Sequence, residues 1–211
     1  SIPTKVHFGK GQIAHLDELK DSGNKVLLVY GGGSIKRAGI YDRALEILQE
    51  AGLTVLELSG VEPNPRIESV RKGVEICKKE KIDMILSIGG GSVIDCGKVI
   101  AAGACSEEDP WELVLHPEKI KAALPLYCVL TLAATGSEMD GAAVISDLEK
   151  QEKWVTASES MKPVMAVMDP EYTFSVSRKQ TAAGTADIIS HIFENYFTSV
   201  KAADVQARFA E

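Results

Sequence analysis

The sequence lacks several features that would place it in a class at once. It has no basic excess, since its formal net charge is −7 at pH 7, whereas nucleic acids and anionic membranes select basic surfaces. No apolar run reaches the roughly 18 residues of a membrane-spanning helix, and residues 1–12 contain no signal-peptide core. We therefore expect a cytoplasmic globular protein that binds neither nucleic acid nor membrane.

Cysteine pairs with metal-ligand or redox spacing are also missing. The four cysteines, Cys77, Cys96, Cys105 and Cys128, form no C-x-x-C motif and lie in apolar stretches. This pattern predicts reduced thiols in the core of a cytoplasmic protein. There are no internal repeats, and 211 residues suffice for one large or two small domains.

Short apolar runs alternate with amphipathic segments from residue 25 to residue 131. Several of these runs end at turn residues such as glycine, which is typical of buried parallel strands. We predict strands at 25–30, 53–58, 83–88 and 125–131, and helices at 41–52, 66–80 and 92–104. The alternation indicates an α/β, Rossmann-like fold, in which helices cover both faces of a parallel sheet.

The pattern changes after about residue 140. Residues 142–146 and 153–158 predict a β-excursion, and 163–170 a further strand. From Ser177 the sequence turns helical and opens on an S-x-x-Q capping pattern. We place a boundary between residues 170 and 177, which gives a domain of residues 1–174 and a second of residues 175–211.

Two glycine-rich turns, GGGS at 31–34 and at 89–92, follow predicted strands. Glycine lets the backbone approach a phosphate closely, and a helix N-terminus offers free N–H groups. Neither turn is the G-x-G-x-x-G fingerprint, and one such turn alone equally fits a tight connection without a ligand. Two of them at adjacent strand ends favour a dinucleotide. Asp95 and Lys98 follow on the next helix, either as an exposed pair or with Asp95 at the cleft.

Asp187 and His191 lie one helical turn apart and project from the same face. A carboxylate and an imidazole in this arrangement can supply two ligands to a divalent metal, whereas a catalytic site usually needs about three. No histidine follows His191, so the site is incomplete in this sequence or the pair is an ordinary hydrogen-bonded or surface pair. The apolar flanks, Ile188, Ile189, Ile192 and Phe193, predict a partly buried setting.

Taken together, these segments resemble the iron-containing, or group III, alcohol dehydrogenase family. The resemblance covers nearly the whole chain and is nearest to the branch of NADPH-dependent butanol dehydrogenases and broad-range aldehyde reductases. It rests on FGKGQI (8–13), YGGGSIKRAGIYD (30–42), EPNPR (62–66), IGGGSVIDCGK (88–98), TLAATGSEMDGAAVIS (131–146), MDP (168–170) and AAGTADIISHIFENYF (182–197).

The resemblance implies a nucleotide domain followed by the beginning of an all-helical metal-binding domain. It implies that iron or zinc binds Asp187, His191 and two further histidines that have no counterpart here. The chain alone is therefore expected to be inactive. The residues implied to contact NADP(H) are Gly32, Gly33, Ser34, Asn64, Gly90, Gly91, Ser92, Asp95, Thr131, Thr135 and Lys153. Asp140 departs from the family, which often carries Asn there, and a carboxylate at that position would repel the cofactor phosphates.

The implied activity is hydride transfer between NADP(H) and a primary alcohol or aldehyde of the butanol and butanal kind. We expect NADP rather than NAD, because Lys36 and Arg37 stand beside the first glycine-rich turn with no acid nearby. Three alternatives remain open at this stage. They are a polyol or phosphopolyol dehydrogenase, a dehydroquinate-synthase-like enzyme and a non-catalytic nucleotide-binding module.

The N-terminal segment KVHFG predicts a strand with no obvious place in the parallel sheet. An exposed edge strand tends to pair with another chain, so we expect a homodimer. His7, His15 and His116 are expected to have surface or structural roles rather than catalytic ones.

Overall fold

The computed structural model describes residues 3–197, 204 and 208. It divides into two units, Ser1–Thr173 and Phe174–Glu211, and each is described here by itself. The strands are β1 (Lys5–Phe8), β2 (Lys25–Tyr30), β3 (Thr54–Leu58), β4 (Met84–Gly89), β5 (Leu126–Leu130), β6 (Ala142–Asp147), β7 (Glu152–Ala157) and β8 (Met165–Met168). The α-helices are α1 (Ser34–Arg37), α2 (Ile40–Glu50), α3 (Ile67–Glu80), α4 (Gly91–Ala104), α5 (Pro110–Leu115) and α6 (Arg178–Tyr196). The 3₁₀ helices are η1 (Gln12–Asp21), η2 (Pro117–Lys119), η3 (Glu159–Met161) and η4 (Pro170–Thr173).

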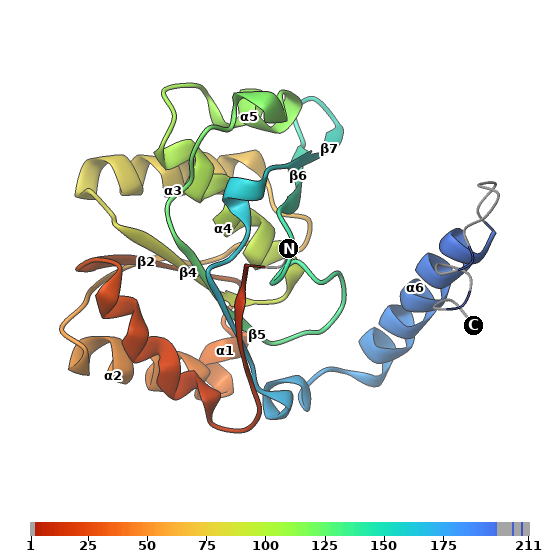
Figure 1. Ribbon diagram of the computed structural model, residues 1–211, viewed down its shortest axis with the longest axis horizontal. Coiled ribbons are helices and arrows are strands. Elements are labelled where there is room, and N and C mark those ends of the chain that lie inside the picture. The colour runs from red at the N-terminus through yellow and green to blue at the C-terminus, as the bar shows by residue number, and fades with distance from the viewer. Residues whose placement is uncertain (1–2, 198–203, 205–207, 209–211) are drawn as a thin grey trace. The chain divides into compact units, whose positions relative to one another are not determined.

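The first unit is built on a six-stranded sheet in the order β1-β8-β5-β4-β2-β3, and every pairing in it is parallel. Successive side chains of each strand point to opposite faces, so each strand contributes to two cores. Leu27 and Ile85 pack with α3, α4 and α5, whereas Leu28 and Leu86 pack with η1 and α2. Figure 1 shows these two helical layers on either side of the sheet. The predicted α/β, Rossmann-like fold is confirmed.

The N-terminal strand has a place in this sheet, so the expectation that it would not was wrong. β1 pairs in parallel with β8, in a register that runs from Lys5 with Met165 to Phe8 with Met168. Its partner lies about 160 residues further along the chain, and no local pattern reveals such a pairing. β1 nevertheless forms one edge of the sheet.

The predicted β-excursion is an antiparallel hairpin of β6 and β7. Ala143 and Ile145 of β6 join the core beneath α4. Thr156 of β7 donates a hydrogen bond of 2.9 Å to the carbonyl oxygen of Leu113 in α5. The hairpin is thereby held against the helices that cover one face of the main sheet.

The cysteines divide into two groups. Cys77, Cys96 and Cys128 are buried, as predicted, but Cys105 is exposed, because it lies at the end of α4 where the chain leaves the core. Burial raises the pKa of Cys77 and of Cys96 to about 12. These two thiols therefore stay protonated and unreactive at neutral pH.

The main described element of the second unit is the helix α6. Gln180 N donates a hydrogen bond of 3.2 Å to Ser177 Oγ, which confirms the predicted cap. The rest of the helical segment predicted from residue 198 onward lies outside the described residues, apart from Asp204 and Arg208. Within the described part of the chain, none of the helices combines the length and the apolar character that a membrane span requires.

Candidate functional site

The carboxyl ends of three neighbouring strands bring the predicted turns together. β4 lies between β2 and β5, and all three strands run parallel. Residues 31–34 follow β2, residues 89–92 begin at the last residue of β4, and residues 131–137 follow β5, so the three turns lie at the same end of the sheet. A hydrogen bond of 3.0 Å from Thr131 N to Gly89 O joins two of them. Ligands of open parallel sheets bind beyond the carboxyl ends of the strands.

The turn after β4 is closely packed against the turn after β5. A Cβ atom at Gly91 would lie 2.8 Å from Thr135 Oγ1, and one at Gly90 would lie 3.3 Å from Leu132 Cβ. Gly90 is also the N-cap of α4, and no side chain among the described residues caps that terminus. The first N–H groups of α4 are therefore available to an anion at the positive end of the helix. This cradle fits the pyrophosphate of a dinucleotide.

The turn after β2 is open at its tip. A Cβ atom at Gly32 would meet no described atom within 4 Å, and Gly33 has a φ of +98°, in the left-handed region. Ser34 begins α1. The Arg37 guanidinium lies 4.0 Å from the position that a Gly33 Cβ would take. A charged group of a ligand can therefore approach the backbone here beside a positive charge.

Glu57 on β3 is an acid near this turn that sequence reasoning missed. Tyr30 and Tyr41 donate hydrogen bonds of 2.7 and 2.6 Å to its two oxygens, and the Lys36 ammonium lies 5.1 and 4.2 Å from the centres of their rings. Burial opposes ionisation of Glu57, but the two tyrosines and Lys36 together lower its pKa. The expectation that no acid lies near Lys36 was therefore wrong, although each oxygen of this acid already accepts one hydrogen bond from a tyrosine.

Asn64, Ser92 and Lys153 come from three separate segments and meet beside the N-terminus of α4. Asn64 N donates a hydrogen bond of 3.3 Å to Ser92 Oγ, and Lys153 Nζ donates one of 2.7 Å to Asn64 Oδ1. Asn64 has a φ of 56°, a left-handed conformation that Asn tolerates and that collects at functional sites. The structure thus brings together three of the residues that the family resemblance associates with the cofactor.

Asp95 and Lys98 hold the segment after β5 against α4. Ser137 Oγ and Val144 N donate hydrogen bonds of 2.6 and 3.0 Å to the two Asp95 oxygens, and burial raises the pKa of Asp95. The Lys98 side chain is completely buried, so the alternative of an exposed helix pair is wrong for it. Its Nζ donates to Ser137 Oγ (2.9 Å), Asp140 Oδ1 (2.8 Å) and the carbonyl oxygen of Ala142 (2.7 Å).

This network also accounts for Asp140, the departure from the family pattern. Its Oδ1 accepts hydrogen bonds from Lys98 Nζ and, at 2.9 Å, from Ala142 N. The ammonium group of Lys98 compensates the charge of the carboxylate. Asp140 is thus directed at the protein's own cation, which removes the reason to expect repulsion of a phosphate.

Asp187 and His191 lie together on α6, with Asp187 Oδ2 3.7 Å from His191 Nε2. Ligands held about 2.0–2.1 Å from a tetrahedral metal lie about 3.3 Å apart, so a small rotamer adjustment suffices for both to bind one ion. Glu194 Oε2 lies 3.6 Å from His191 Nδ1 and can orient the ring. The two side chains are 57% and 65% exposed, and Ile188, Ile189, Ile192 and Phe193 are exposed as well. The partly buried setting of this pair stays a prediction, because these exposed fractions describe α6 without the remainder of the helical domain that the family resemblance implies.

The iron-containing alcohol dehydrogenase family matches residues 3–170. The chain belongs to this family. It is 58% identical, over 212 aligned residues, to NADH-dependent butanol dehydrogenase A of Clostridium acetobutylicum, covering 100% of this chain and 54% of that protein. It is 44% identical to the NADPH-dependent aldehyde reductase YqhD of Escherichia coli, covering 99% of this chain and 54% of that protein.

The crystal structure of NADH-dependent butanol dehydrogenase A from Thermotoga maritima superposes with a TM-score of 0.92 at 42% identity, covering 99% of this chain and 54% of that chain. The chain thus spans about half the length of the curated relatives it matches. The family resemblance found in the sequence is confirmed. Membership of the iron-containing alcohol dehydrogenase family implies a nicotinamide cofactor and a divalent metal, and the two glycine turns and the Asp187–His191 pair suit these groups.

Proposed function

We propose that this chain supplies the dinucleotide site and the first two metal ligands of an NADP-dependent enzyme that interconverts primary alcohols and aldehydes. The observation that carries the proposal is the convergence of three turns at the carboxyl ends of β2, β4 and β5. Backbone N–H groups of the second turn bind the pyrophosphate, and Asn64, Ser92 and Lys153 form its polar rim. Asp95 and Lys98 position the third turn, which carries Thr131 and Thr135.

The proposed preference for NADP rests on the turn after β2. NAD-selective sites place a carboxylate against the ribose 2′-hydroxyl, and that charge rejects a 2′-phosphate. Here Glu57, on the neighbouring strand β3, accepts hydrogen bonds from two tyrosines. Arg37 lies beside Gly33 and can pair with a phosphate. The relatives' names divide between NADH and NADPH, so the support comes from these residues and not from the names.

Asp187 and His191 would hold the metal together with ligands supplied from outside this chain's residues. When bound, a divalent metal polarises the substrate carbonyl and stabilises the alkoxide that develops on hydride transfer. We propose iron or zinc, because an imidazole and a carboxylate suit both. The chain's own contribution is to fix the imidazole, with the Glu194 carboxylate near its second nitrogen.

The substrate class follows from the relatives, whose names describe butanol dehydrogenases and an aldehyde reductase. We propose short-chain aldehydes such as butanal. We also propose a homodimer, because Val6 and Phe8 on the edge strand β1 are 39% and 70% exposed. Light scattering that shows only monomer at micromolar concentration would contradict the dimer. The free cysteines of the described residues suit the reducing cytoplasm, which we propose as the location.

The test is NADPH oxidation with butanal by the natural protein that carries this sequence. We expect turnover that is lost on chelation, returns with Fe²⁺ or Zn²⁺, and falls by at least about 10³-fold in Asp187→Ala and His191→Ala. The matched control is His116→Ala, an exposed histidine on a different segment. Chelation without effect on turnover, or equal activity in His191→Ala and His116→Ala, would overturn the metal assignment.

A further inference from the structure

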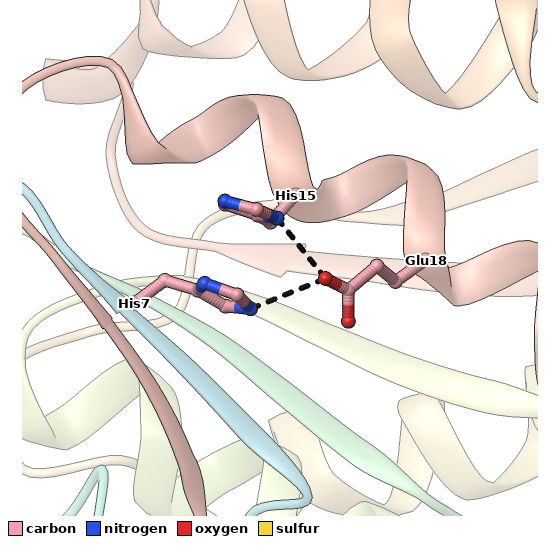
Figure 2. Close-up of side chains that lie close together, drawn as sticks. All are labelled: His7, His15 and Glu18. Atoms are coloured by element: carbon pink, nitrogen blue, oxygen red, sulfur yellow. Dashed lines mark hydrogen bonds and ion pairs between the residues drawn. The ribbon is translucent and has the colours of Figure 1, made fainter.

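Two histidines and a glutamate form a compact cluster at the β1 edge of the sheet, away from the turns at β2, β4 and β5. His7 comes from β1, and His15 and Glu18 come from η1 (Figure 2). His15 Nδ1 lies 3.0 Å from Glu18 Oε1, and His7 Nε2 lies 3.3 Å from the same oxygen. One ligand atom from each of the three residues lies within 4.8 Å of the others.

The local structure explains why these side chains meet. η1 is a 3₁₀ helix of 10 residues, although such helices are usually limited to about 3–4 residues. With three residues per turn, side chains at i and i+3 stand directly above one another. Ile13, Leu16 and Leu19 form one such row and are buried against the sheet. His15 and Glu18 form the neighbouring row, which faces His7 on β1 (Figure 2).

We propose that His7, His15 and Glu18 form a second divalent-metal site, of the zinc class, separate from the Asp187–His191 pair. Two imidazole nitrogens and a carboxylate oxygen are a usual three-ligand set for zinc. Ligands about 2.0–2.1 Å from a tetrahedral ion lie about 3.3 Å apart, close to the 3.0 and 3.3 Å separations found here. His7 Nε2 is buried and has no hydrogen bond of suitable geometry among the described residues, so it points into the cluster unsatisfied.

The cluster is accessible to solvent on one side. The side chain of His7 is only 11% exposed, whereas those of His15 and Glu18 are 40% and 32% exposed. An ion therefore has a route of entry from the His15 side.

Two features of the metal-free cluster oppose metal binding, and one of them can be removed by mutation. The two imidazole rings are stacked, with centres 3.7 Å apart and planes 12° from parallel, so their lone pairs converge on one ion only after the rings tilt. Lys5 Nζ lies 2.7 Å from Glu18 Oε2 and repels a cation at the neighbouring Oε1. Removal of the Lys5 charge should therefore strengthen metal binding.

The experiment measures Zn²⁺ bound after gel filtration, and the visible absorption of Co²⁺ as a readout of coordination. It uses the natural protein with Asp187→Ala and His191→Ala, so that the first site does not contribute. We expect one equivalent of Zn²⁺, an affinity at least about tenfold lower after the further change His15→Ala or Glu18→Gln, and an affinity about fivefold higher after Lys5→Met. His116→Ala, near Glu112 and Glu118, is the control and should bind normally.

The proposal is wrong if the background protein takes up no Zn²⁺, or if His15→Ala and Glu18→Gln take up as much as His116→Ala. The far-ultraviolet circular dichroism spectrum of each variant reports that it is folded. Because the glycine turns belong to other strands, dinucleotide affinity should also stay within about twofold of the background in all of them. Failure of the proposed dehydrogenase function would leave these metal measurements unchanged.

Discussion

Lys98 Nζ donates a 2.8 Å hydrogen bond to Asp140 Oδ1 although the lysine side chain is completely buried and the Asp140 side chain is 47% exposed. The pair is therefore asymmetric: the lysine depends on its partners, whereas water still reaches the carboxylate. Ser137 Oγ and the carbonyl oxygen of Ala142 complete the donor capacity of the ammonium group. These contacts tie the turn after β5, part of the proposed cofactor site, to α4.

Changes at the two partners should have unequal effects on stability. Lys98→Met removes the cation that compensates the largely buried Asp95 and the donor to the carbonyl oxygen of Ala142, so we expect a loss of about 3–5 kcal/mol. Asp140→Asn keeps an oxygen that can accept from Lys98, and we expect a loss of about 1–2 kcal/mol. Urea unfolding measures both changes. Equal losses, or a smaller loss for Lys98→Met, would show that the buried ammonium is not the centre of this network.

Arg37 should determine the choice between the two nicotinamide dinucleotides. We expect Arg37→Ala to weaken NADP binding about tenfold, through loss of a charge-assisted hydrogen bond to the 2′-phosphate, and to leave NAD binding unchanged. Arg43→Ala, an exposed arginine paired with Glu46, is the matched control. Calorimetry measures the dissociation constants of both cofactors for each protein. A wild type that binds NAD as tightly as NADP would contradict the proposed preference for NADP.

Asp83 should make stability depend on pH in the acid range. Hydrogen bonds from Asn24 N and Lys25 N, 2.7 and 2.9 Å long, hold the pKa of Asp83 below its usual value of 3.8. A lowered pKa in the folded state means that the stabilisation is complete above the unfolded pKa and disappears as the pH falls through the folded one. Asp83→Asn should therefore cost about 1 kcal/mol at pH 7 and flatten the decline in stability below about pH 4.

Unfolding at several pH values tests this prediction, with Asp17→Asn on the exposed side of η1 as the control. The control should keep the wild-type decline in stability below about pH 4. A decline that is as steep in Asp83→Asn as in the control would assign the acid sensitivity to other carboxylates.

Local sequence patterns reveal those features of the fold that depend on residues close together in the sequence. The strand from 25 to 30 and the turn that follows it are visible because apolar periodicity and glycine act within a few residues. The pairing of β1 with β8 is invisible, because its register depends on residues about 160 positions apart. Dinucleotide-binding folds use an acid in this region to bind the ribose hydroxyls. The position of Glu57 on the second strand of the repeating unit could therefore have been recognised in the sequence.

The candidate site shows the same limit. The glycine turns and the Asp187–His191 pair can be read from spacing alone. The buried state of Lys98 cannot, because it depends on Asp140 and Ser137, about 40 residues away. The cluster of His7, His15 and Glu18 depends on η1 being a 3₁₀ helix, in which side chains at i and i+3 stand directly above one another. In an α-helix the same two side chains would be offset around the helix axis.

The most direct test of the central claim is a titration of NADPH into the 211-residue chain, followed by nicotinamide fluorescence, for wild type, Gly32→Ala and Gly184→Ala. A Cβ atom at either glycine meets no described atom within 4 Å, so neither change disturbs the protein itself. If the dinucleotide lies against the turn after β2, wild type and Gly184→Ala will bind one equivalent with the same affinity, and Gly32→Ala will bind at least about tenfold more weakly. No saturable binding by the wild type, or equal affinity in all three proteins, would contradict the assignment of this site.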